Sequence, residues 1–335
     1  MYKNYTIGIV VPAYNEEKLI EETLSSIINS EVDADKIYVL DDKSTDKTLE
    51  KIKKFKNKFK NNEKICIIAH EKNKGVGGAI ISGYKKALED HIDIAVVMAG
   101  DNQMDPLQLP RMLDPIIAGR ADYTKGNRLL GREYRKGMSK WRFFGNAMLS
   151  FLTKIASGYW QVMDPQNGYT AISRDLLERI SLDDVYPWYG YCNDLLVRLN
   201  ALNAVVEDVV MPAMYGREAS GIRYSTYIFK VSWLLLKDFL WRLKMKYVVF
   251  SFHPLVLFYF FGFLMTPIGV LLGLYIFHHK ILEADLPVST NLPLLAVFLL
   301  VMGIQFLLFA MLFDMEADPN RKIHAEFNLN NRSRI

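Results

Sequence analysis

Residues 6–17, TIGIVVPAYNEE, decide the fold of the N-terminal part of the chain. A short apolar run, typical of a strand, passes into a polar turn and then into a helical pattern. This alternation continues along the chain. Strands are predicted at residues 6–12, 36–40, 64–69 and 92–98, and helices at residues 16–29, 45–58, 76–89 and 108–119. Strands that alternate with helices predict an open α/β sheet of parallel strands covered by helices.

Three of the predicted strands end in polar runs: residues 12–16 (PAYNE), 41–44 (DDKS) and 100–103 (GDNQ). Ligands of open α/β sheets bind at these carboxyl ends. The first strand is not followed by GxGxxG, which disfavours a dinucleotide, and no GxxxxGK[ST] phosphate loop is present. A nucleotide would therefore have to be held in another way.

The last third of the chain has a different composition. Residues 247–277 and 286–313 contain no Asp, Glu, Lys or Arg, and each run exceeds the roughly 20 residues that cross a bilayer as a helix. We expect transmembrane helices at residues 247–278 and 286–313, rather than a pair of buried core helices. Residues 225–246 mix Trp, Phe and Leu with Lys and Arg, which predicts an amphipathic helix at the membrane interface. The alternative is a helix packed on the soluble domain.

Basic residues set the expected orientation, because cytoplasmic flanks of membrane spans carry an excess of them. The connection between the spans carries a single Lys or Arg residue, Lys280. The outer flanks carry Arg242, Lys244, Lys246, Arg321, Lys322, Arg332 and Arg334. The N-terminal domain, residues 1–224, and the tail, residues 314–335, are therefore expected on the cytoplasmic side of the cell membrane.

Charge and cysteine content argue against a nucleic-acid-binding protein and against a cysteine-based metal site. The net charge of +4 is too small to indicate nucleic acid as a partner. Cys66 and Cys192 show no metal-binding spacing and fit a reducing compartment. The lipid bilayer is an expected binding partner. An anchor of only two spans is also compatible with a homo-oligomer.

The polar runs belong to longer motifs: residues 10–17 (VVPAYNEE), 40–48 (LDDKSTDKT) and 73–79 (NKGVGGA). In this order they resemble the start of glycosyltransferase family 2, and more narrowly the dolichol-phosphate mannose synthases and related polyprenyl-phosphate glycosyltransferases. The resemblance covers about residues 6–224. It implies a GT-A fold, which is a Rossmann-like nucleotide-sugar domain, and a donor such as GDP-mannose or a UDP-sugar.

The resemblance assigns the donor contacts at the first two strand ends. Pro12, Tyr14 and Glu16 match the family's nucleoside contacts, and Asp41 and Asp42 match an acidic pair that accepts hydrogen bonds from ribose or base. The alternative for the second run is helix capping.

At the fourth strand end the resemblance implies that Asp101 and Gln103 bind Mg²⁺ or Mn²⁺, and that residues 99–101 approach the donor. Such a cation stabilises the charge of a departing diphosphate and prefers hard oxygen ligands. The family usually has an acidic residue where this chain has Ala99, followed by Gly100 and Asp101, so one carboxylate is missing. The alternative is that Asp101 only forms a turn.

Two arginines carry the expected acceptor chemistry. Arg128 and Arg142 match arginines that lipid-phosphate enzymes place on the acceptor phosphate, for which a guanidinium fork is well suited. The alternative makes them ordinary partners of acidic residues such as Asp122 or Glu133.

Further positions follow from the resemblance alone. Asp164 and Gln166 lie in a loop near the donor sugar, and Asp194 follows Asn193 where related enzymes carry acids. Arg217 and Ser220 lie where the family closes a loop over the diphosphate. A hydroxyl acceptor needs a general base, but a phosphate acceptor is already ionised near neutral pH, so Asn193 is compatible with it.

These features together predict inverting transfer of one hexose from a nucleotide-sugar to dolichyl or polyprenyl phosphate. A processive polysaccharide synthase would require a QxxRW motif and more spans, and this chain has neither. Two alternatives stay open. One is a membrane glycosyltransferase that acts on a lipid or glycan hydroxyl, and the other is a non-catalytic membrane protein that binds nucleotide-sugars.

Overall fold

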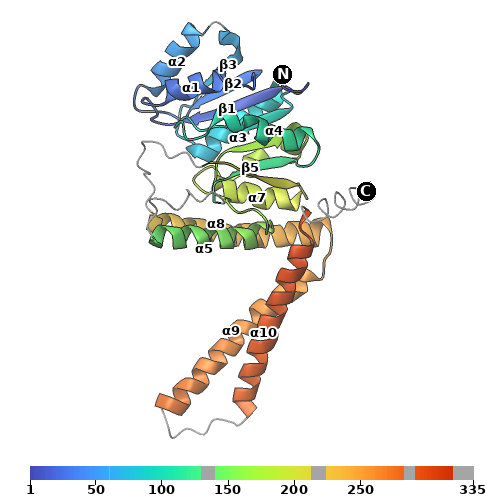
Figure 1. Ribbon diagram of the computed structural model, residues 1–335. Coiled ribbons are helices and arrows are strands. Elements are labelled where there is room, and N and C mark those ends of the chain that lie inside the picture. The colour runs from blue at the N-terminus through green and yellow to red at the C-terminus, as the bar shows by residue number, and fades with distance from the viewer. Residues whose placement is uncertain (60, 130–139, 213–223, 283–290, 320–335) are drawn as a thin grey trace, which may run out of the picture.

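The computed structural model describes residues 1–59, 61–129, 140–212, 224–282 and 291–319. Three tiers follow one another in space: an α/β domain, a layer made by two long helices, and a helical hairpin (Figure 1). The layer consists of α5 (Lys140–Ser157) and α8 (Tyr224–Lys244), and the hairpin of α9 (Leu255–Phe277) and α10 (Asn291–Glu316). The layer thus separates the domain from the hairpin.

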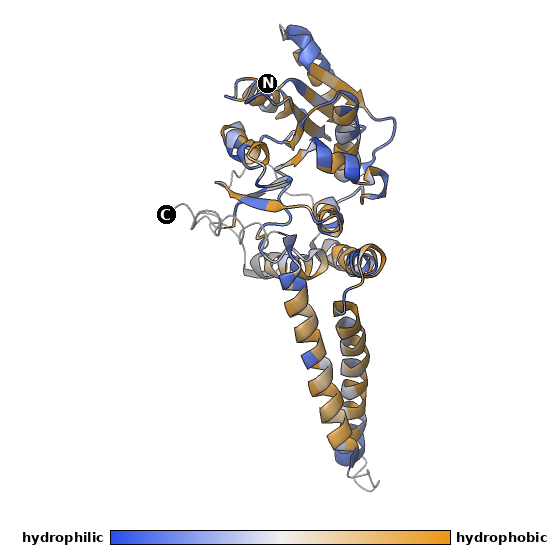
Figure 2. Ribbon diagram, turned by 90° about the vertical axis from the view of Figure 1, so that its right-hand side faces the viewer, coloured by the Kyte–Doolittle hydropathy of each residue, from blue (hydrophilic) through white to orange (hydrophobic). Residues whose placement is uncertain are grey.

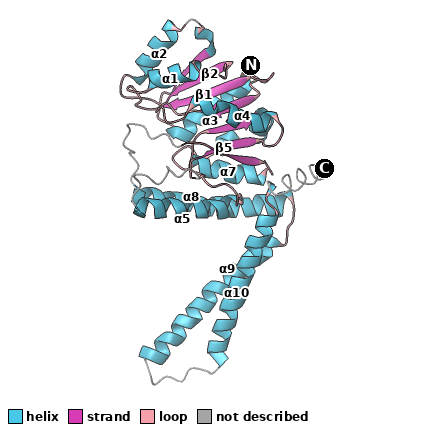
Figure 3. Cartoon of the chain, in the orientation of Figure 1, coloured by secondary structure: helices cyan, strands magenta, loops and turns pink. Residues whose placement is uncertain are grey.

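The α/β domain contains a seven-stranded sheet in the order β3-β2-β1-β4-β6-β5-β7 (Figure 3). Its strands are β1 (Ile7–Ala13), β2 (Lys36–Asp41), β3 (Ile65–Ala69), β4 (Ile94–Val97), β5 (Tyr123–Asn127), β6 (Thr170–Ser173) and β7 (Val206–Val210). Its helices are α1 (Ile20–Ile28), α2 (Thr48–Lys58), α3 (Gly75–Glu89), α4 (Leu109–Ile117), α6 (Arg174–Arg179) and α7 (Tyr191–Ala201). The four predicted strands and the four predicted helices are present with slightly different ends.

The four predicted strands are parallel to one another, as expected, but the sheet also contains β6, which is not predicted from the sequence. This strand pairs antiparallel with both β4 and β5, so the sheet is mixed. Residues 120–220 show no continuous apolar run, because β5 and β6 are short and carry buried polar side chains such as Thr124, Lys125 and Thr170. The period that identifies a strand in sequence is therefore missing there.

Alternation along β1 builds a core on each face of the sheet. Val10 packs with residues of α3 and α7, whereas Ile9 and Val11 pack with residues of α1 and α4. Gly83 lets α3 approach the sheet closely, since a Cβ atom there would collide with the Val10 side chain. Both faces are thus covered, and the strand ends are left to hold ligands.

Helix α8 has two apolar faces rather than one. Val231, Leu235, Phe239 and Leu243 are buried in a cluster with residues of α5, α7 and the hairpin. A second stripe with helical spacing is exposed: Phe229, Trp233, Leu236 and Leu240. One face of α8 is therefore packed on protein, and the other leaves an apolar stripe exposed, for which the interfacial interpretation of residues 225–246 stays a prediction. Arg242 and Lys246, counted above as flanking charges, are buried in protein.

The hairpin is hydrophobic along most of its length (Figure 2), and many of its large apolar side chains are exposed. Both of its helices are long and apolar enough to cross a membrane. The first begins at Leu255, later than predicted, because Met245–Phe250 forms a π-helical turn and Pro254 starts a new helix. The second begins at Asn291 and extends to Glu316, past the predicted end at residue 313.

Candidate active site

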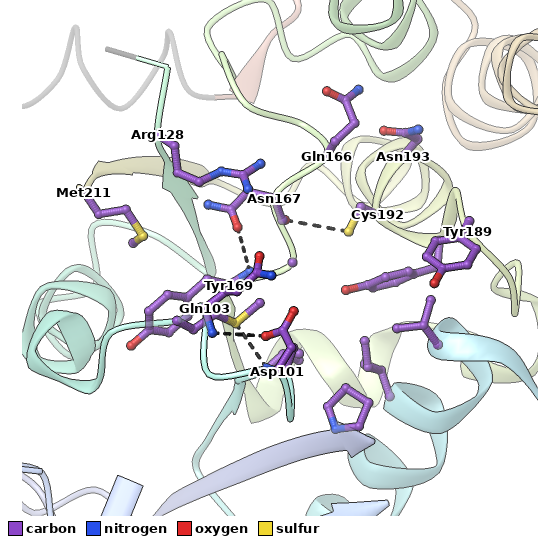
Figure 4. A pocket seen from close by; sticks show the side chains of 18 of the residues that line it. Asp101, Gln103, Arg128, Gln166, Asn167, Tyr169, Tyr189, Cys192, Asn193 and Met211 are labelled. Carbon is purple, nitrogen blue, oxygen red and sulfur yellow. Dashed lines mark hydrogen bonds between the residues drawn. The ribbon is translucent and has the colours of Figure 1, made fainter. Parts of the chain in front are cut away.

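A cavity of about 410 Å³ lies at the carboxyl ends of β1 and β4, beside the N-terminus of α7. Most of its wall comes from the turn after β4, the loop before β6, and the start of α7 with the loop that precedes it (Figure 4). Among the predicted site residues, its lining includes Pro12, Ala99, Asp101, Gln103, Arg128 and Gln166. Residues from four distant parts of the sequence thus meet where the open-sheet rule places a ligand.

The turn after β4 is fixed by backbone contacts. The Gly100 N–H donates to the Pro12 carbonyl at 3.0 Å, and the Thr23 hydroxyl donates to the Gly100 carbonyl at 2.9 Å. Asn102 adopts a positive φ of 55°, and the Gln103 N–H donates to Asp101 Oδ1 at 3.1 Å. The turn brings the Asp101 and Gln103 side chains to the same cavity wall. Gly100 itself does not line the cavity.

The oxygens at this turn fit a hard divalent cation only as a partial set. Asp101 offers a carboxylate and Gln103 an amide oxygen, while Ala99 offers no ligand atom. Within the described ranges, no group of three or more His, Cys, Asp or Glu side chains could hold a metal. Most ligands of a cation bound here would therefore come from a phosphate-bearing substrate and water.

Asp41 and Asp42, at the end of β2, have different surroundings. Asp42 Oδ1 lies 2.8 Å from His70 Nδ1 and accepts the Lys74 N–H at 2.8 Å, so this carboxylate holds the loop after β3. Asp41 Oδ2 accepts the Ser44 N–H at 3.4 Å. Asp41 Oδ1 is buried and has no hydrogen-bond partner among the described residues. The geometry therefore leaves Asp41 as the candidate ligand-binding member and gives Asp42 protein contacts instead.

Tyr14 and Glu16 follow β1 on the loop next to these acids. Tyr14 is 47% exposed, and the Glu16 N–H donates to Thr48 Oγ1 at 2.8 Å, which ties the loop to the start of α2. Neither residue lines the cavity, and neither do Asp41 and Asp42. These four predicted donor contacts thus lie at the neighbouring strand ends, beside the cavity that Pro12 and Asp101 line.

Arg128 lines the cavity and forms an ion pair with Asp164, another predicted site residue. Its Nε and Nη2 donate to Asp164 Oδ2 at 2.8 Å and Oδ1 at 3.2 Å. The Asp164 carboxylate is buried against Arg128 and does not line the cavity, and its approach to the donor sugar stays a prediction. Asp122, the partner suggested for Arg128, accepts the Val205 N–H instead.

Gln166 and Asn193 lie on the same side of the cavity as Arg128, and Asp101 lies on the other (Figure 4). Leu149 of α5 also lines the wall, so this side borders the helical layer. Asp194 does not reach the cavity. Its carboxylate accepts the Tyr186 N–H at 2.7 Å and the Arg198 Nε–H at 3.0 Å, so these contacts lie within the protein and its assignment to the donor stays a prediction.

Several lining residues were missed in the sequence. Tyr191 and Cys192 line the cavity at the start of α7, and burial raises the pKa of Tyr191 well above its usual value, so its phenol is neutral. His70, which holds Asp42, follows β3 directly and could have been found by the strand-end rule. No comparable signal marks Tyr191 or Cys192.

The remaining predicted residues cannot be placed. Arg142 belongs to α5, but its side chain lies outside the described part of the structure. Arg217 and Ser220 lie outside the described residues.

Comparison with known proteins identifies the family. Residues 8–181 match the family described as glycosyl transferase family 2. The chain is 35% identical over 208 residues to UDP-N-acetylglucosamine–dolichyl-phosphate N-acetylglucosaminyltransferase of Methanococcus voltae, covering 59% of this chain and 82% of the relative. It is 30% identical over 222 residues to dolichol-phosphate mannosyltransferase of Pyrococcus furiosus, covering 64% and 58%.

Solved structures support the fold. Glucosyl-3-phosphoglycerate synthase from Mycobacterium tuberculosis, in complex with Mn²⁺, UDP and glucosyl-3-phosphoglycerate, superimposes with a TM-score of 0.53 at 22% identity. The match covers 71% of this chain and 80% of that chain, so the α/β domain has a GT-A-like fold. The chain therefore belongs to glycosyl transferase family 2 and is a glycosyltransferase.

Proposed function

We propose that this enzyme transfers one hexose from a nucleotide-sugar to the phosphate of a dolichyl or polyprenyl phosphate. The observation that carries the proposal is the position of the cavity. Asp101 lies on one side, and Arg128 lies on the other, which borders the α5–α8 layer above two helices that could span a membrane (Figures 1 and 4). A phosphate on a membrane lipid would approach from the Arg128 side.

The names of relatives support this acceptor. Besides the two archaeal enzymes, an undecaprenyl-phosphate mannosyltransferase of Micrococcus luteus is 27% identical over 207 residues. The donors differ between these names, since one relative uses UDP-N-acetylglucosamine and others transfer mannose. UDP-N-acetylglucosamine is the first donor to test, because the relative that uses it shares 35% identity with this chain. GDP-mannose is the second.

Donor binding is assigned to the ends of β1, β2 and β4. Asp41 Oδ1 is a buried acceptor without a partner among the described residues, and a ribose hydroxyl or a base N–H would satisfy it. Pro12 lines the cavity next to it in the sheet and would support the ring. Asp101 and Gln103 would hold Mg²⁺ or Mn²⁺ together with the diphosphate. The bound cation would supply compensation for charge that develops on the leaving group.

The transfer itself needs little acid–base chemistry from the protein. A phosphate oxygen attacks the anomeric carbon, the new carbon–oxygen bond forms on the face opposite the nucleoside diphosphate, and the bond to the diphosphate breaks. The attacking oxygen is already ionised near neutral pH, so no base is needed, and Asn193 suffices where a hydroxyl acceptor would require a carboxylate. Arg128, and Arg142 from α5, would orient the acceptor phosphate.

The layer and hairpin would hold the enzyme at the membrane. The exposed stripe on α8 continues into Val248, Val249 and Phe250, and α5 adds Met148 and Phe151. An apolar face of this kind at the base of two spans fits the interfacial region of a bilayer. We assign residues 225–246 to this interface and place the α/β domain and the tail on the cytoplasmic side, following the basic residues around the spans.

The decisive experiment compares acceptors that differ only in the phosphate. Purified enzyme in vesicles would be given each nucleotide-sugar with either a polyprenyl phosphate or the corresponding polyprenol, and the products identified by mass spectrometry. Product from the phosphate alone is expected, with the anomeric configuration inverted. Product from the polyprenol would favour a hydroxyl acceptor and contradict the proposal. Failure of every donor with both lipids would also contradict it.

A further inference from the structure

Arg242 of α8 and Asp314 of α10 form a buried, two-point ion pair where the hairpin meets the layer. Arg242 Nη1 and Nη2 donate to Asp314 Oδ1 and Oδ2, each at 2.8 Å. Both side chains are 0% exposed. The Tyr247 hydroxyl adds a third hydrogen bond, to Asp314 Oδ1 at 2.6 Å. This contact joins the layer to the end of the second apolar helix.

The same guanidinium also holds two helices that line the cavity. Its Nε donates to the Ala156 carbonyl at 2.8 Å and its Nη2 to the Ile155 carbonyl at 3.0 Å, both at the end of α5. Its Nη1 reaches Asn200 Oδ1 of α7 at 3.4 Å. All five N–H donors of the side chain therefore have acceptors, and they come from three different helices.

The surrounding chain is shaped to admit this side chain. Gly158, directly after α5, has a φ of 74°, and a Cβ atom there would collide with the Arg242 guanidinium. Lys246, in the π-helical turn that follows α8, donates to Asn200 Oδ1 at 2.7 Å. The arrangement thus depends on a glycine and on a second buried cation as well as on the pair.

Stability alone is a poor explanation for this pair. The apolar cluster that includes Phe239, Tyr259 and Ala310 already packs the same joint. Replacing a buried ion pair by well-packed apolar side chains is often neutral or stabilising, because desolvation offsets the attraction between the charges. What a bidentate pair adds is a defined geometry, since its hydrogen bonds are directional.

We propose that Arg242 and Asp314 are positioning residues that hold the cavity in a fixed relation to the bilayer. The far ends of α5 and α7 are tied to α10, while Leu149 of α5 and Asn193 of α7 line the cavity. A hairpin fixed in the membrane would thereby set the height and direction at which the cavity meets a lipid-borne phosphate. This inference rests on the proposed polyprenyl-phosphate acceptor.

The test compares a membrane-embedded acceptor with a soluble one. We would assay three proteins: wild type, Asp314→Asn, and the double variant Arg242→Met with Asp314→Leu. Each would be given a long-chain polyprenyl phosphate in vesicles and, separately, a short isoprenyl phosphate that is monomeric in water. We expect kcat/KM for the embedded acceptor to fall about tenfold to a hundredfold, as for a misplaced reactant, and that for the soluble acceptor to stay within about twofold. The milder Arg242→Lys should show a smaller split in the same direction.

The double variant and a surface control keep the result interpretable. The double variant removes both charges of the pair together, so neither Arg242 nor Asp314 is left without its partner, and Lys246 keeps its hydrogen bond to Asn200. Arg120→Met, which breaks the pair between Arg120 and Glu207 on the α/β domain, should leave the ratio between the two acceptors unchanged. An unchanged ratio in folded Asp314 and Arg242 variants, or equal losses on both acceptors with a lowered melting temperature, would overturn the inference. If wild type uses neither acceptor, the proposed function fails first.

Discussion

Arg128 and Asp164 face each other at the edge of the cavity, with the guanidinium Nε 2.8 Å from Oδ2 and Nη2 3.2 Å from Oδ1. The Asp164 side chain is 3% exposed, whereas that of Arg128 is 35% exposed. The carboxylate is therefore enclosed by protein while part of the arginine side chain stays accessible. This asymmetry fits an arginine that Asp164 orients toward a ligand.

Replacing Arg128 by Lys keeps the charge but removes the fork. We expect turnover of the lipid phosphate to fall by about one to two decades, which corresponds to about 1.5–3 kcal/mol for a charged hydrogen bond. Arg142→Lys should act in the same way, and Ala should cost more than Lys at either position. Donor affinity, measured by calorimetry, should change little. Unchanged turnover together with a lower melting temperature would mean that the arginines only stabilise the fold.

Asp164→Asn is the matched control, because it weakens the pair and leaves the guanidinium in place. If Arg128 contacts the acceptor, this variant should retain more turnover than Arg128→Lys, and its KM for the lipid phosphate should rise less. If Asp164→Asn and Arg128→Lys lowered kcat and raised KM by the same factors, the pair would serve instead to hold the loop before β6.

Asp101→Ala should abolish turnover while the protein stays folded, because it removes the protein carboxylate at the expected cation site. Activity should require Mg²⁺ or Mn²⁺ and disappear in excess chelator. Asp114→Asn, at an exposed carboxylate of α4 that pairs with Lys3, is the control for loss of an acid and should keep full activity. Full turnover of wild type in excess chelator would rule out the metal assignment.

Ala99→Asp should be tolerated, since Ala99 lines the same cavity wall as Asp101. A carboxylate there adds a hard oxygen ligand, so the concentration of cation needed for half-maximal activity should fall or stay the same. A strong loss of activity at saturating cation would show that the loop is matched to the family incorrectly.

The sequence predicts the first half of the sheet well, because β1 to β4 are apolar runs between helical patterns. It does not predict β5 and β6, whose buried polar groups interact with neighbouring loops, as Lys125 does with the Asn167 carbonyl. Periodicity measures burial of apolar side chains, and these strands are stabilised partly by polar contacts.

The site shows a similar division. Pro12, Asp101 and Gln103 could be found because they lie at or just beyond the ends of strands, and the structure brings them to one cavity. The difference between Asp41 and Asp42 depends on His70 and Lys74, which lie in another loop. Arg242 is read from sequence as a flanking charge, because its partner Asp314 is 72 residues away, in α10. Contacts over such separations leave no local pattern.

Trp233 on the exposed face of α8 should report directly on the bilayer. It is 60% exposed, and in a variant where it is the single tryptophan, brominated lipids should quench its fluorescence strongly. The control is a single tryptophan introduced by Lys54→Trp on α2, at the opposite end of the α/β domain from the layer (Figure 1). Equal quenching at both positions, or none at Trp233, would argue against an interfacial α8.

Asp238 should make the stability of the enzyme depend on pH. Its side chain lies on α8, only 8% of the residue is exposed, and its Oδ2 has no hydrogen-bond partner among the described residues. Burial, reinforced by the charge of Asp194 and opposed by those of Arg198 and Lys237, raises the pKa of Asp238 to about 8. The native protein therefore keeps this proton at pH values where the unfolded chain, with an ordinary aspartate pKa near 3.8, has released it. The free energy of unfolding should fall as pH rises between about 4 and 8, by up to about 1.4 kcal/mol per pH unit from this group, and then level off.

Asp238→Asn should remove this dependence, because its amide stays neutral at every pH in the range. Melting temperatures of wild type and variant in detergent should be similar near pH 4, and the variant should become increasingly the more stable of the two as pH approaches 8. Asp183→Asn, at an acid whose side chain is 86% exposed, should follow the wild-type curve and serves as the control for the loss of one negative charge. Parallel curves for wild type and Asp238→Asn from pH 5 to 8 would mean that the buried carboxyl is already ionised in the native state, held so by Arg198 and Lys237.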